Sequence, residues 1–100
     1  MTDAPWLQDA CSLVDAYRSG DRNPVEDTQA CLDAIDASGL NAFSHVEAES
    51  ALATARTADT SLPFGGVPMG VKELEPVQGW PHTEASLAFR DRRATYDTTM

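Results

Sequence analysis

Residues 65–80 read GGVPMGVKELEPVQGW, and in this stretch a lysine directly follows a run of small and apolar residues. The run from Gly66 to Val71 offers no polar side chain to either face, which is typical of a strand inside a sheet that is covered on both sides. Lys72 ends the run, and acid, proline and glycine follow it. We therefore predict a central strand over about 67–71, with Lys72 at its C-terminal end.

The ordinary explanation of such a lysine is a solvated residue whose stem covers apolar surface. Three neighbours weaken that explanation. Gly66 and Gly70 are poor strand formers, so their presence indicates a close approach of backbone rather than strand propensity. Pro68 removes one donor from any hydrogen-bonded ladder, which indicates a special local geometry. Lys72 is therefore the first candidate for a functional residue.

Residues 1–60 are expected to be mainly helical. Apolar residues recur at helical spacing from Trp6 to Tyr17, and Gly20 ends that pattern. A second helix opens with Asn23 as its cap and ends at Gly39. The other elements expected here are a short strand over 40–46 and a helix over about 47–58.

Residues 62–100 are expected to hold the lysine-bearing strand and then a loop from about residue 80 to residue 93. The last residues, ATYDTTM (94–100), resemble the start of a helix in which Asp97 would be the cap. The pattern stops there, so we interpret residues 1–100 as one N-terminal segment of a larger, truncated domain. Its fold class is predicted to be α/β.

Composition limits the class of protein. Hydrophobic residues make up 42% of the chain, which is ordinary for a globular protein and too high for disorder. The formal net charge of −9 argues against nucleic acids and anionic membranes as partners. The start MTDAPWLQDA has no basic or apolar region of a secretory signal, and a cytoplasmic location is expected.

Other reactive side chains give weaker indications. Cys11 and Cys31 lack metal-ligand or CxxC spacing, and we interpret them as reduced thiols packed on helix faces. His45 is expected to be structural or exposed, and His82 lies in a predicted loop without a partner acid or nucleophile. The pair at 65–66 is not a phosphate loop, because no GxGxxG or GK[ST] follows. We predict no metal site and no cofactor.

The segment LPFGGVPMGVKELEPVQGW (62–80) resembles the first conserved block of the amidase signature hydrolases. The family pattern runs Gly, Val or Ile, Pro, three variable residues, Lys, an acid and a later Gly. The matching residues are Gly66, Val67, Pro68, Lys72 and Gly79. The segments LNAF (40–43) and YDTT (96–99) are also similar to parts of the family's N-terminal region.

The match has departures. Glu73 stands where the family more often has aspartate, and ELEPVQGW differs from the KDN run of the family's amidotransferase members. Thr83 and Ser86 match the Thr and Ser that follow in the pattern, but Ala85 replaces a frequent glycine.

The resemblance implies an α/β fold in which helices pack on a mixed β-sheet. It also implies cleavage of a carboxamide C–N bond through a Ser–cis-Ser–Lys triad, with Lys72 as the catalytic lysine and a small-molecule amide as substrate. The family's serines come from a downstream block rich in Gly and Ser, which is absent before Met100. The 100 residues alone are therefore expected to be inactive, with water reaching Lys72 and with self-association through the uncovered strand.

Two alternatives remain open. The chain could be a small acidic interaction module in which GVPMGVK is only a core strand. It could also be a segment of the amidotransferase component that feeds ammonia to misacylated tRNA. The identity of the amide substrate is not readable, because the family's acyl pocket is built mostly downstream.

Overall fold

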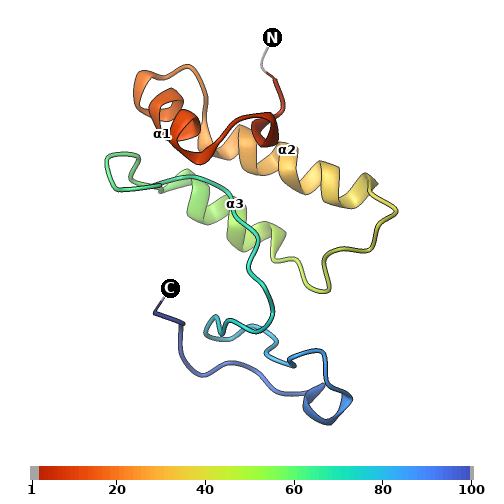
Figure 1. Cartoon of the computed structure of the whole chain (residues 1–100). Helices are drawn as coiled ribbons and strands as arrows, with labels where there is room; N and C mark the ends of the chain where they lie inside the picture. Colours follow the sequence, from red (N-terminus) through yellow and green to blue (C-terminus); the bar gives the residue numbers. More distant parts are fainter. Residues whose placement is uncertain (1–2, 100) are drawn as a thin grey trace. The chain divides into compact units, whose positions relative to one another are not determined.

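The computed structural model describes residues 3–99, whose regular elements are all helical (Figure 1). The described chain forms two compact units, which divide between Pro68 and Met69. All three α-helices lie in the N-terminal unit, and the C-terminal unit consists of turns and one short 3-10 helix. The elements are η1 (Pro5–Leu7), α1 (Ala10–Ser19), α2 (Pro24–Ala37), α3 (Ala48–Arg56) and η2 (Leu87–Phe89).

Local capping explains where α1 and α2 begin and end. The Asp9 carboxylate accepts a hydrogen bond of 2.7 Å from the Ser12 N–H and caps α1, and this bond lowers the pKa of Asp9. Gly20 ends α1 at a φ of 84°, in the left-handed region that glycine favours. The Asn23 side chain accepts from the N–H of Val25 at 2.8 Å and caps α2. The predicted stop at Gly20 and the predicted cap at Asn23 are confirmed.

The first helix differs from the prediction at its N-terminal side. Residues 5–7 form the separate turn η1, and Trp6 and Leu7 are exposed. Cys11 is also exposed, so the expectation that it packs on a helix face is wrong. Cys31 is half-buried, and this burial, followed by the negative charge of Asp27, raises its pKa.

A buried ion pair joins the chain between α1 and α2 to α2 itself. The Arg22 guanidinium donates to both carboxylate oxygens of Asp27 at 2.9 Å, and the Tyr17 hydroxyl donates to the same carboxylate at 2.9 Å. The side chains of Arg22 and Asp27 are only 5% and 6% exposed. Arg22 also donates to the carbonyl of Asp3 at 2.6 Å. This network therefore connects the N-terminal segment, α1 and α2.

The glycine pair at 65–66 is required by packing and backbone conformation. A Cβ on Gly65 would collide with the carbonyl oxygen of Asp59, and a Cβ on Gly66 would lie 2.7 Å from Cγ of Pro24. Gly66 also has a φ of 89°. Arg18 holds the preceding turn by donating to the carbonyl of Thr60 at 2.9 Å. At Gly66 the close neighbour is thus the Pro24 side chain, and the close approach of another backbone segment occurs at Gly65.

Neither predicted strand is present, because no β-strand occurs within residues 3–99. Asn41 adopts a φ of 54°, which interrupts an extended run over 40–46. The N–H groups of residues 69–71 donate no hydrogen bond to the part of the chain that is described. A strand exists only when a neighbour satisfies its backbone groups, and residues 3–99 supply no neighbour. The helix expected over 47–58 is confirmed as α3.

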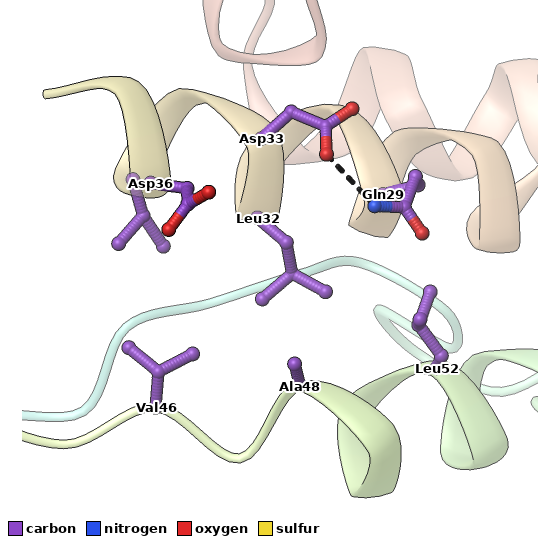
Figure 2. A pocket seen from close by; sticks show the side chains of 8 residues that line it. Gln29, Leu32, Asp33, Asp36, Val46, Ala48 and Leu52 are labelled. Carbon is purple, nitrogen blue, oxygen red and sulfur yellow. Dashed lines mark hydrogen bonds between the residues drawn. The ribbon is translucent and has the colours of Figure 1, made fainter.

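The packing of α2 on α3 leaves an open groove of about 420 Å³ (Figure 2). Leu32 projects from α2 toward Val46 and Ala48 on the opposite side. The groove is lined by Gln29, Leu32, Asp33, Ile35, Asp36, Val46, Ala48 and Leu52. Gln29 donates to Asp33 at 2.8 Å. The apolar side chains of Leu32 and Ile35 on α2 are thus only partly covered within this unit.

We expect Asp27→Ala to destabilise the N-terminal unit by about 3–5 kcal/mol, because it leaves the Arg22 guanidinium buried without its partner. Such a loss is comparable with the whole stability of a small domain, about 5–15 kcal/mol. Thermal unfolding followed by circular dichroism measures the change. Asp15→Ala, on the exposed side of α1, is the matched control. Equal melting curves for the two variants would contradict the predicted effect of the ion pair on stability.

Stability should also fall at high pH through Tyr17. Burial, and then the hydrogen bond to Asp27, raise the pKa of its phenol above the usual value of about 10. The folded state therefore keeps a proton that the unfolded state releases, so the stabilisation is complete below pH 10 and is lost as pH rises further. Urea unfolding at pH 8 and pH 11 should show a larger loss for the wild type than for Tyr17→Phe. A Tyr96→Phe control should behave as the wild type.

Candidate functional site

Lys72 lies in the C-terminal unit and is exposed. Its carbonyl accepts a hydrogen bond of 2.9 Å from the N–H of Glu75, so the lysine opens a tight turn rather than ending a strand. Its ammonium group makes no hydrogen bond or ion pair with any residue between 3 and 99. The exposure agrees with the expectation that water reaches Lys72 in this chain.

Both acids of the KELE turn are bound to threonines from later segments. The Thr83 hydroxyl donates to Oε1 of Glu73 at 2.6 Å. The Thr98 hydroxyl donates to Oε2 of Glu75 at 2.9 Å, and the Thr98 N–H donates to the carbonyl of Pro76 at 2.9 Å. These bonds fix the backbone that follows Lys72 to two segments that lie later in the chain.

The loop that follows is closed by backbone hydrogen bonds. They join Gly79 N to Ala94 O at 2.8 Å, Ala94 N to Trp80 O at 2.9 Å and His82 N to Arg92 O at 3.0 Å. Gly79, a residue of the matching pattern, has a φ of 86°. Glycine is suited to this position because other residues are strained in the left-handed region. Ala94, whose backbone makes two of these bonds, is buried.

Two further motif positions have clear local roles. Ser86 accepts a hydrogen bond from the N–H of Ala88 at 3.2 Å and caps η2, and no hydrogen bond links it to the Lys72 ammonium. Ala85 has a φ of 58°, although glycine is frequent at this position of the pattern. A side chain in this region costs about 1–2 kcal/mol, so the departure at Ala85 introduces local strain.

The other polar residues singled out from the sequence form hydrogen bonds or ion pairs with neighbouring groups. His82 pairs with the carbonyl of Leu74 at 3.3 Å and with Glu84 at 3.6 Å. His45 pairs with Glu47 at 2.9 Å. Asp97 does not begin a helix in the described chain; its carboxylate instead accepts from the N–H of Gln78 at 2.8 Å. The interpretation of Asp97 as a helix cap is therefore corrected.

Two other kinds of site are absent from the described residues. Between residues 3 and 99, no three His, Cys, Asp or Glu side chains come close enough together to hold a metal ion. Over the same residues, no helix has the length and apolar composition that a membrane crossing requires.

Sequence reasoning identified Lys72 but missed the residues that hold its turn. Glu73 and Thr83 were noted as positions of a pattern, and Glu75 and Thr98 were given no role. The acids at 73 and 75 are the one local feature that could have indicated them, because side chains two residues apart in an extended segment point to the same side. Their partners are 10 and 23 residues away, so no local pattern pairs them.

Comparison with known proteins places this chain in a family. The family model described as Amidase matches residues 26–100. One subunit of the glutamyl-tRNA(Gln) amidotransferase of Salinispora tropica is 37% identical over all of this chain and 22% of its own length. The corresponding protein of Cereibacter sphaeroides is 39% identical over 86% of this chain and 19% of its own length. No solved structure matches the chain.

The chain thus spans about a fifth of the length of these curated relatives. The matched region contains all of the C-terminal unit, with Lys72 and the threonine-bound turn, together with α3 and most of α2. A match over three quarters of the chain establishes its descent, and the chain belongs to the amidase signature family.

Proposed function

We propose that this chain carries the catalytic lysine of an enzyme that cleaves a carboxamide C–N bond. The observation that carries the proposal is the position of Lys72: it lies within the family match and opens a fixed turn, and its ammonium group is not engaged by the described residues. A lysine held by its backbone and free at its amine is suited to exchange a proton with a reacting group.

The proposed reaction uses two serines from outside these 100 residues. The neutral amine of Lys72 takes a proton from the bridging serine, which takes one from the nucleophilic serine. The nucleophile's oxygen bonds to the amide carbon, the C–N bond breaks, and the proton passes to the leaving nitrogen. Water then hydrolyses the acyl-enzyme by the reverse proton transfers, which regenerates both serines and releases the acid.

A lysine must be neutral to act as this base. The ordinary pKa of a lysine side chain is about 10.4. Burial can lower such a value by about 3–5 units, which is enough for function near neutral pH. We propose that the remainder of the family fold covers the turn and supplies that burial. In the same assembly, residues 67–71 would pair with neighbours and form the strand of a mixed sheet; uncovered, they would promote association between chains.

The second candidate is narrower. The two relatives described above are named as subunits of a glutamyl-tRNA(Gln) amidotransferase. This name favours a role in a tRNA-dependent amidotransferase, in which glutamine would be the amide that is cleaved. The two candidates share the same bond cleavage and differ in substrate, so a panel of amides that includes glutamine distinguishes them.

A chimera tests the proposal directly. This chain replaces the matched segment of the Salinispora tropica relative, to which it aligns over its full length. We expect the chimera to release ammonia from an amide, and we expect Lys72→Ala to reduce kcat by about 100- to 10,000-fold, the usual contribution of a general base. Lys72→Arg should be equally impaired, because a guanidinium cannot lose its proton in a protein.

Arg90→Ala is the matched control, because it removes an exposed cation from the same unit and should leave activity unchanged. The 100-residue chain without the serine-bearing remainder should release no ammonia. Full activity in the Lys72→Ala chimera would contradict the assigned role.

A further inference from the structure

We infer that Glu73 and Glu75 are positioning residues for Lys72, acting through hydrogen bonds to Thr83 and Thr98. The inference rests on the proposed function and adds to it the residues that hold the base in place. Neither acid needs to touch the substrate. Each carboxylate instead fixes the turn from which the lysine side chain projects.

The turn is bound at each residue that follows the lysine. Glu73 accepts from Thr83 at 2.6 Å, and Glu75 accepts from Thr98 at 2.9 Å. Between them, the carbonyl of Leu74 pairs with a ring nitrogen of His82 at 3.3 Å. Backbone and side-chain bonds thus act together over residues 73–75.

The two carboxylate bonds close loops of different length. The partners of Glu73 and Glu75 are 10 and 23 residues away along the chain. Each bond therefore closes a loop and restricts backbone conformations of the turn that local interactions alone would allow. Both acids are half-buried, and an ionised acceptor makes a hydrogen bond stronger than one between neutral groups. Neither acid forms an ion pair with an Arg or Lys of the described chain, so the carboxylates are available to the threonines.

The arrangement matters for catalysis because a base must be placed accurately. A displacement of about 1 Å at a reacting group can lower the rate about 100-fold. Lys72 has a flexible side chain, so its reach is set by where the turn holds its backbone. Loosening the turn should therefore reduce turnover even though no reacting atom is removed.

The threonines give a clean test, because Val has the shape of Thr without its hydroxyl and Ser keeps the hydroxyl. In the chimera, Thr83→Val should lower kcat about 10- to 100-fold with little change in KM, and Thr83→Ser should restore kcat to within about twofold. The pair Thr98→Val and Thr98→Ser should show the same pattern. A loss of general stability would not be rescued in this selective way.

A second measurement uses the 100-residue chain and does not depend on activity. The N–H of Glu75 donates to the carbonyl of Lys72, so its hydrogen exchange, measured by NMR, reports whether the turn is closed. Exchange should become faster in Thr83→Val and Thr98→Val and stay unchanged in the two serine variants. Exchange that is equal in all variants would show that the threonines do not hold the turn, and would overturn the inference.

The outcomes separate the two proposals. If Lys72→Ala abolishes activity while Thr83→Val and Thr98→Val leave kcat unchanged, the positioning role is wrong and the proposed function stands. If Lys72→Ala keeps full activity, there is no base to position and both proposals are overturned. If kcat falls equally in the Val and Ser variants, the threonines support the fold in general, and the inference is again wrong.

Discussion

The helical part of this protein depends on one buried ion pair. Arg22 lies between α1 and α2, donates to both oxygens of Asp27, and extends to the carbonyl of Asp3. A buried pair adds little to stability compared with an apolar core, but it is costly to break. The Tyr17 hydroxyl of α1 donates to the same carboxylate. The pair, together with Tyr17, therefore links α1 to α2.

The C-terminal unit is held by a different kind of interaction. Between residues 69 and 99, the buried apolar side chains are Pro76 and Ala94. Directional hydrogen bonds therefore hold most of this unit in place. Those bonds converge on the turn that Lys72 opens, through Thr83 and Thr98. A site built in this way keeps a lysine fixed by its backbone while leaving its amine open. This combination favours chemistry at the lysine over a purely structural role.

The range of each interaction explains what the sequence could predict. Asn23 and Gly20 set helix ends through contacts within a few residues, and both were readable. The strand predicted over 67–71 is absent from the described chain, because strand pairing needs a neighbour from elsewhere and none lies within residues 3–99. The small and apolar residues before Lys72 singled it out, and the family resemblance then implied its role. The hydrogen bond between Glu73 and Thr83 was not predicted, because the two residues are 10 positions apart and no local sequence pattern pairs them.

The central claim is that this chain supplies a lysine-bearing strand to a sheet that the remainder of the family fold completes. Amide hydrogen exchange of Met69 and Val71 tests it most directly, measured in the chain alone and in the chimera with its relative. The account predicts fast exchange in the chain, where these N–H groups donate no hydrogen bond to the described residues, and strong protection in the chimera. Equal exchange in both proteins would show that no strand forms around Lys72 and would contradict the account.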